Sequence, residues 1–191
     1  AQHLADTSLN GKSIKEINIL KGRKDKPRQQ AETILDMMDA GGAQMVYHGM
    51  SEDDVKYFMK YPVNMVGADG GVVETGKGMP HPRSYGTNAR VLGKYVREEQ
   101  VVPLEEALRR MTSLPARKFN LHDRGLLLPG MAADIVVFDE KTVGDRATFE
   151  QPHQYSKGFR YVIVNGRLVI DEGVHNGERS GKPLYGPAKL F

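Results

Sequence analysis

Asp69 is the residue of this sequence whose surroundings most suggest chemistry. It lies in the glycine-rich run 67–71, Gly-Ala-Asp-Gly-Gly, shortly after the apolar segment Val63–Val66. A carboxylate between glycines, which let a ligand or a metal approach the backbone, suits a metal ligand or a general base. The same carboxylate could instead belong to a turn aspartate, which hydrogen-bonds to its own backbone.

The loop predicted at residues 76–86 contains two further candidates, His81 and Arg83. Pro80 and Pro82 are expected to hold both residues in extended backbone. A guanidinium group is suited to bidentate recognition of a carboxylate, so Arg83 could contact a substrate. The alternative is that Arg83 forms a structural ion pair with a surface acid.

Histidine and cysteine usage excludes several kinds of site. The six histidines include no pair two or four residues apart, so neither an HxH nor an HExxH metal motif is present. There is no cysteine, which excludes disulfides, thiolate zinc sites and cysteine nucleophiles in this chain. His48 is interpreted as structural, and the histidines other than His48 and His81 as packing or surface residues.

The charge balance gives no sign of a polyanionic partner. The 191 residues contain 27 Lys and Arg against 24 Asp and Glu, a net charge of +3. The basic run 21–28 is interrupted by Asp25 and is interpreted as a solvated linker, so we expect no nucleic-acid partner. No apolar run is long enough for a bilayer, and residues 1–10 do not resemble a signal peptide. A cytoplasmic chain without membrane contact is therefore expected, and the missing initiator methionine suggests a piece of a longer chain.

Helices are expected where a capping residue or a proline precedes apolar residues at spacings of three and four. Their predicted starts are Ser13, Pro27, Ser51, Thr87 and Pro103. Residues 44–47 and 63–66 are predicted as short strands. The second of these places Asp69 at the carboxyl edge of a parallel sheet or barrel, and the alternation of elements indicates an α/β fold.

The sequence changes to β character after Gly125. Residues 133–138 are predicted as a buried strand, because residues 135–138 are β-branched or aromatic. Two apolar runs, 161–164 and 167–170, flank Asn165-Gly166, which is a preferred sequence for a type I′ hairpin turn. The last twenty residues are expected to form an irregular tail.

Several stretches of this sequence together resemble one known group of enzymes. They are Met65–Gly70, His81–Thr87, Glu105–Ala107 with Met111–Ala116, Arg124-Gly125, Gly130–Asp139 and Val164–Gly166. These stretches resemble the C-terminal part of the metal-dependent amidohydrolases, and most closely the N-acyl-D-amino-acid deacylase (D-aminoacylase) family. Residues 111–139 are similar in amidohydrolases at large, including dihydroorotase-like and hydantoinase-like enzymes, whereas the loop His81–Thr87 points to the deacylase branch.

The resemblance implies a TIM-like barrel that carries a metal site, and a small β-domain built from both chain ends. Residues 1–43 would be a helical insertion segment. Residues 44–124 would supply the last barrel strand, at 63–66, and the C-terminal barrel helices. Residues 125–191 would form part of the small composite β-domain and a tail. The implied fold class is α/β, with this chain as a C-terminal fragment of the barrel plus strands of the β-domain.

The same resemblance implies roles for the three candidate residues. Asp69 would lie beside zinc, accept a proton from the attacking water, donate it to the leaving amine, and be at most a weak ligand of a second metal. Arg83 would hold the carboxylate of an N-acyl-D-amino acid, and His81 would shape the loop or contact the substrate. The other zinc ligands would lie on earlier strands, outside this chain. Ala68 departs from the family pattern, in which serine is common at that position.

A chain that carries so little of a metal site should not hydrolyse a substrate by itself. Its uncovered apolar faces should make it associate with itself or with the missing N-terminal part. Two alternatives remain open. The parent enzyme could be dihydroorotase-like or hydantoinase-like and hydrolyse a cyclic amide. The chain could also be a non-enzymatic interaction module derived from the family.

Overall fold

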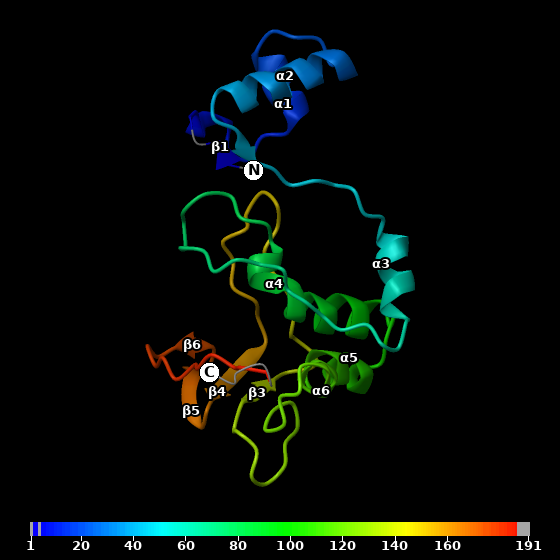
Figure 1. The fold of residues 1–191 in the computed structure, drawn as a ribbon, viewed down its shortest axis with the longest axis vertical. Coiled ribbons are helices and arrows are strands. Elements are labelled where there is room, and N and C mark those ends of the chain that lie inside the picture. The colour runs from blue at the N-terminus through cyan, green and yellow to red at the C-terminus, as the bar shows by residue number, and fades with distance from the viewer. Residues whose placement is uncertain (1, 4, 187–191) are drawn as a thin grey trace. The chain divides into compact units, whose positions relative to one another are not determined.

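The computed structural model describes residues 2, 3 and 5–186, and these form two compact units (Figure 1). The first unit comprises Ala1–Gly49, Asp69–Tyr85 and Ala147–Gln154, and the second comprises Met50–Ala68, Gly86–Arg146 and Tyr155–Phe191. The chain is therefore α/β, with six α-helices and a small antiparallel sheet among the described residues. No helix in the described part of the chain is long and apolar enough to cross a membrane.

The first unit contains a helical hairpin whose two helices begin where the sequence predicts. Helix α1 (Ile14–Leu20) follows Ser13, whose hydroxyl accepts from the Glu16 amide at 3.2 Å while the Glu16 carboxylate accepts from the Ser13 amide at 2.7 Å. Helix α2 (Pro27–Asp39) has proline as its first residue. It ends before Gly41 and Gly42, whose φ angles of 103° and 83° do not continue a right-handed helix.

Polar side chains as well as apolar ones are buried in this hairpin. Ile17 and Met37 are buried, and so are Asn18 and Thr33. The Thr33 hydroxyl donates to Asn18 Oδ1 at 2.8 Å, and Asn18 Nδ2 donates to the Lys24 carbonyl at 2.7 Å, so both buried groups are satisfied. The basic run 21–28 therefore includes backbone that is tied to the hairpin.

A short two-stranded ladder and a turn of 3-10 helix complete the start of the first unit. Strand β1 (Gln2–His3) pairs antiparallel with β2 (Ala43–Gln44), and η1 (Thr7–Leu9) follows β1. Of the strand predicted at 44–47, only Gln44 has a ladder partner. Residues 45–47 continue without one and line a cavity described below.

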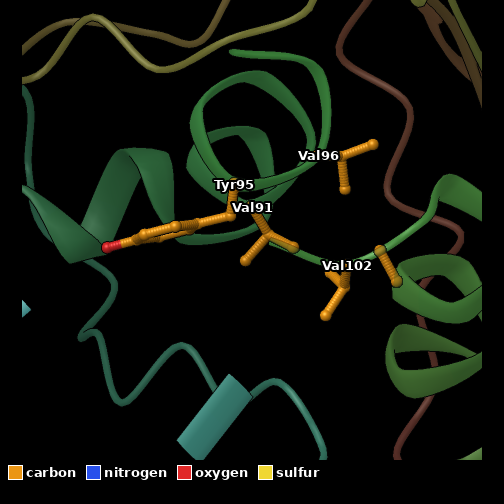
Figure 2. Close-up of a cluster of buried hydrophobic side chains, with 5 residues drawn as sticks. Val91, Tyr95, Val96 and Val102 are labelled. Atoms are coloured by element: carbon orange, nitrogen blue, oxygen red, sulfur yellow. The ribbon is translucent and has the colours of Figure 1, made fainter. Parts of the chain in front are cut away.

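The second unit is built around a helical core. Its helices are α3 (Glu52–Met59), the end of α4 (Arg83–Arg90), the π-helix η2 (Val91–Glu98), α5 (Leu104–Met111) and α6 (Ser113–Lys118). The buried side chains of Val91, Tyr95 and Val96 on η2 lie with Val102 and Ala107, as Figure 2 shows for the labelled residues. Met59, Val66 and other partly buried apolar residues pack against this cluster.

Helix α4 begins five residues earlier than predicted, at Arg83 instead of directly after a Thr87 cap. Pro82 directly precedes it, and its fixed φ suits a helix start as well as an extended chain. The ring nitrogen Nδ1 of His81 accepts from the Arg83 amide at 3.1 Å, and the His81 carbonyl accepts from the Ser84 amide at 3.0 Å. These bonds satisfy amides of the first turn, so the expected extended backbone at Arg83 is wrong.

Residues 63–66, predicted as the last barrel strand, form no strand in the described structure. A strand needs a neighbour on which to form a ladder, and among the described residues no strand runs beside this segment. It is held by helix α5 instead. The Val66 amide donates to the Arg110 carbonyl at 3.3 Å, and Arg109 Nη2 donates to the Pro62 carbonyl at 2.6 Å.

The β part of the second unit is a four-stranded antiparallel sheet in the order β3 (Ile135–Phe138), β4 (Phe159–Val164), β5 (Arg167–Asp171) and β6 (Val174–His175). The predicted hairpin is confirmed, since Asn165 and Gly166 join β4 to β5 with φ angles of 48° and 77°. Burial of β3 is not confirmed, because Val136 and Val137 on this edge strand are 51% and 43% exposed. Strand β6 lies in the predicted irregular tail, and residues 187–191 of that tail lie outside the described residues.

Glu106 should make the stability of the second unit depend on pH in the acid range. Arg109 Nε and Arg110 Nε each donate to its carboxylate at 2.7 Å, and these bonds lower the pKa of Glu106 from 4.5 to about 2. Because the folded-state pKa lies below the unfolded-state value, this stabilisation is complete above about pH 4.5 and is lost as the pH falls toward 2. Glu106→Gln should therefore unfold at lower urea concentration than the parent at pH 7, and the difference should shrink toward pH 2.

The exposed neighbour Glu105 provides the matched control, since it lies in the same helical turn. Glu105→Gln should leave the pH dependence of urea unfolding unchanged. A Glu106→Gln variant that keeps the parental difference between pH 7 and pH 3 would contradict this account.

Candidate functional site

Asp69 and Arg83, two of the three residues singled out in the sequence, lie side by side in the first unit. Arg83 Nη2 is 3.1 Å from Asp69 Oδ2, and the side chains are 46% and 83% exposed, respectively. Asp69 has a φ of 46°, in the left-handed region that aspartate tolerates better than most residues. The sequence suggests two roles for Arg83, recognition of a substrate carboxylate or an ion pair with a surface acid. In this structure the carboxylate beside Arg83 is that of Asp69.

The approach of the Asp69 loop to helix α4 depends on Gly70. A Cβ atom on Gly70 would lie 2.7 Å from Ser84 Cα and 3.1 Å from the Arg83 carbonyl oxygen. Only glycine allows two backbone segments to come this close. The Asp-Gly pair thus brings the carboxylate against the first turn of the helix that carries Arg83.

His81, the third candidate, precedes Arg83 and is fixed by it. Since the Arg83 amide donates to Nδ1, that nitrogen carries the lone pair, and the proton of the neutral ring is on Nε2. Burial lowers the pKa of His81 below its usual 6.5, the positive charges of Arg83 and His48 act in the same direction, and Asp69 opposes them. At neutral pH the ring is therefore an uncharged donor at Nε2.

Phe149 connects two of the histidines. Its ring meets the His81 ring edge-on with centroids 5.1 Å apart, and meets the His48 ring with centroids 5.0 Å apart. His48, interpreted from the sequence as structural, thus lies in the same cluster as a candidate site residue. No sequence pattern selects Phe149 as a site residue, because its partners lie 68 and 101 residues earlier in the chain.

A cavity of about 420 Å³ adjoins these residues. It is lined by residues 44–47 and 79–81, and by Arg83. The lining is polar and apolar in about equal measure: methionine, valine, tyrosine and proline side chains form its apolar part, and Gln44 with the imidazole and the guanidinium provides polar groups. Sites for small molecules typically combine an apolar wall with a few polar groups in a volume of this order. The cavity could receive a small molecule that has both an apolar portion and a carboxylate.

The described residues do not form a metal centre. They contain no group of three or more His, Cys, Asp or Glu side chains placed to hold an ion. The candidate metal residue, Asp69, has its carboxylate beside the Arg83 guanidinium instead. Zinc sites use three or four protein ligands, so the residues present in the described part of the chain do not by themselves fit a zinc ion.

Comparison with known proteins identifies the family of this chain. The sequence pattern of the amidohydrolase family matches residues 22–170. The N-acyl-D-glutamate deacylase of Alcaligenes xylosoxydans xylosoxydans is 45% identical over 148 residues, which make up 78% of this chain and 30% of that protein. The D-aminoacylase of the same organism is 37% identical over 176 residues, covering 92% of this chain and 34% of that protein. The resemblance predicted from the sequence is thereby confirmed.

A solved structure gives the same result for the fold. The N-acyl-D-glutamate deacylase of Bordetella bronchiseptica, complexed with zinc and a phosphonate that mimics the tetrahedral intermediate, superposes with a TM-score of 0.76 at 38% identity. The superposition covers 88% of this chain and 33% of that protein. The expected cofactor, zinc, is thus present in a relative. The chain spans about a third of the length of the relatives that it matches.

The alternative of a cyclic-amide hydrolase has weaker support. The dihydroorotase of Lactobacillus acidophilus is 33% identical over 93 residues, which cover 42% of this chain. The deacylases match over a much larger share of the chain and at higher identity.

Gly70→Ala should separate Asp69 from Arg83, because the added methyl group cannot be accommodated between the two backbone segments. Overpacking of this kind destabilises a fold by about 1–3 kcal/mol. Hydrogen exchange of the amides at residues 69–71 and 83–85 should become faster, and thermal unfolding of the first unit should occur at lower temperature. Gly71→Ala is the matched control, because a Cβ atom at that position meets nothing within 4 Å. Identical behaviour of the two variants would show that the close approach is not what positions Asp69.

Proposed function

The chain belongs to the amidohydrolase family, and we propose that it forms the C-terminal third of a zinc-dependent hydrolase that cleaves the amide bond of N-acyl-D-amino acids. The observation that carries this proposal is the pairing of Asp69 with Arg83, which lines a cavity with both polar and apolar walls. Hydrolysis of such a substrate needs a group that transfers protons at the amide and a cation that holds the free carboxylate. The chain provides one residue for each task within 3.1 Å of each other.

Asp69 is the proton carrier in this proposal. Water adds to the amide carbonyl carbon, and Asp69 accepts the proton that the water loses. The C–N bond then breaks, and Asp69 donates the same proton to the leaving nitrogen, which yields a carboxylate and a D-amino acid. Zinc, when bound by ligands from the rest of the family fold, polarises the carbonyl group. Asp69 is at most a weak ligand of a second metal.

Arg83 holds the substrate carboxylate in this proposal, in place of its present partner Asp69. An exposed ion pair such as Arg83–Asp69 is worth only about 0–1 kcal/mol. A substrate carboxylate can therefore replace Asp69 as the partner of the guanidinium, and Asp69 is then free to accept a proton. Neutral His81 can donate a hydrogen bond to the substrate through Nε2, or act only by shaping the loop through Nδ1.

The proposal extends to the remainder of the fold. Residues 63–66 become the last barrel strand when earlier strands are beside them, with residues 1–43 as a helical insertion and 125–191 as part of the small β-domain. Exposed aromatic side chains support the proposal that another part of the enzyme covers this surface. Tyr57, Phe58 and Tyr61 are 74%, 58% and 61% exposed. Clusters of exposed apolar side chains typically mark surfaces that another chain or segment covers.

The 191-residue chain should be inactive on N-acetyl-D-methionine when zinc is supplied. The reason is that Asp69 alone cannot hold the ion, and an assay of amine release in the presence of zinc measures this directly. Sedimentation velocity on the same sample should show self-association, because the aromatic cluster is uncovered. Zinc-dependent turnover well above that of buffer, or a monomer at all concentrations, would contradict the corresponding part of the proposal.

Arg83→Ala should weaken substrate binding in a full-length deacylase that contains this chain. Loss of a charge-assisted hydrogen bond should raise KM for N-acetyl-D-methionine by roughly 10- to 100-fold, with a smaller effect on kcat. The carboxamide analogue of this substrate has no charge for Arg83 to recognise, so its hydrolysis should be affected much less. Arg90→Ala, which removes a guanidinium paired with Asp145 at 3.0 Å, is the control for loss of an arginine from the same helix. Equal losses for both substrates would contradict the assigned role.

A further inference from the structure

His153 makes three contacts with a part of the chain that lies far from it in sequence. Its Nδ1 is 3.3 Å from the Gly76 amide nitrogen and 2.9 Å from the Tyr85 hydroxyl, and its Nε2 is 3.1 Å from the Gly78 carbonyl oxygen. The rings of His153 and Tyr85 also meet edge-on, with centroids 5.7 Å apart. All of these residues belong to the first unit.

These partners determine the state of the His153 ring. A backbone amide can only donate, so the bond from Gly76 requires a lone pair on Nδ1, and the Tyr85 hydroxyl then donates to the same nitrogen. A carbonyl can only accept, so the bond to Gly78 requires a proton on Nε2. The ring is therefore the neutral Nε2–H tautomer, with both nitrogens already used within the protein. A ring with both nitrogens hydrogen-bonded in this way holds its partner residues in place and is not available to bind a metal or transfer a proton.

The residues that His153 contacts lie on both sides of His81 and Arg83 in the sequence. Gly76 and Gly78 precede His81 and Arg83 in the chain, and Tyr85 follows them, so one imidazole ties down both ends of the intervening segment. Fixing both ends of a short segment removes most of its conformational freedom. Neither end of the segment 76–85 can move away from His153 without breaking at least one of these bonds.

The part of the chain that carries His153 is itself well fixed. The Thr148 amide donates to the Gln151 carbonyl at 3.1 Å, and the Gln151 amide donates back to the Thr148 hydroxyl at 3.0 Å. The same part carries Phe149, whose ring meets that of His81. Residues 147–154 therefore contact the site-bearing segment near its start, at His81 and at its end.

We propose that His153 is a positioning residue, which orders the segment 76–85 and thereby holds His81 and Arg83 in the geometry that binds the substrate carboxylate. The ordering of the segment follows from contacts within this chain, whereas the effect on substrate binding rests on the proposed function. No histidine pattern in the sequence indicates this role, since the partners of His153 lie 68 to 77 residues away.

The tautomer and the ordering are tested on the 191-residue chain without any substrate. Ring ¹⁵N spectra at neutral pH should show His153 as the Nε2–H tautomer, with the signal assigned by its loss in a His153→Asn variant. In His153→Ala, hydrogen exchange at residues 76–78 should become roughly tenfold faster. The amides of helix α5, in the second unit, serve as the internal reference and should not change.

Conservative variants distinguish the loss of the hydrogen bonds of His153 from the loss of its side-chain volume. His153→Asn keeps an acceptor near the place of Nδ1 and should restore much of the protection at Gly76, whereas His153→Gln keeps a donor near Nε2 and should restore it less. Tyr85→Phe removes only the hydroxyl and should accelerate exchange less than His153→Ala. An Nδ1–H tautomer, unchanged exchange at 76–78 in His153→Ala, or equal acceleration in helix α5 would each overturn the positioning role.

The consequence for catalysis is measured in a full-length deacylase that contains this chain. His153→Ala should raise KM for N-acetyl-D-methionine several-fold while kcat changes less, with partial rescue by His153→Asn. A parental enzyme without deacylase activity would refute the proposed function and leave the tautomer and exchange results standing. An active parental enzyme whose KM is insensitive to His153→Ala would refute the positioning role alone.

Discussion

The close approach of Gly70 to Ser84 is the contact on which the geometry of the candidate site depends. It places a backbone segment directly against the first turn of helix α4, at a distance that no residue with a side chain would permit. Asp69, the residue before it, takes a left-handed conformation and presents its carboxylate to Arg83. Every role proposed for the two residues requires this proximity, because an acid and a cation that act on one small substrate must lie within a few ångströms of each other.

The candidate site residues of this chain are arranged by contacts among themselves and not by a metal ion. The Asp69–Arg83 pair, the capping bond from Arg83 to His81 and the contacts of Phe149 are all made between residues of the first unit. What the described residues lack is a set of ligands that could hold zinc. The proposed function therefore divides the chemistry: it assigns carboxylate recognition and proton transfer to this chain, and the metal ligands to the rest of a longer enzyme.

Features that depend on neighbouring residues could be predicted from the sequence. The helix starts at Ser13 and Pro27 and the hairpin turn at Asn165-Gly166 are decided by groups within four positions of each other, and each is present. The strand predicted at 63–66 does not form among the described residues, because a strand also requires a partner and the described residues supply helix α5 instead. The start of α4 was misplaced because Pro82 fits a helix start as well as an extended loop, and the capping ring nitrogen of His81 decides between them. His153 and Phe149 were not predicted as site residues, since their importance arises only from contacts across more than 65 residues.

The interleaving of the two units has a consequence for how the protein acquires its structure. The first unit is assembled from three separate stretches, and the last of them, Ala147–Gln154, follows most of the second unit in the chain. A ribosome must therefore release residue 154 before the first unit can close, although nearly all of that unit has been synthesised by residue 85. Domains whose contacts are mainly local can fold as they emerge, whereas contacts across such separations form slowly. The segment that carries the candidate site is thus synthesised before the residues that complete its unit.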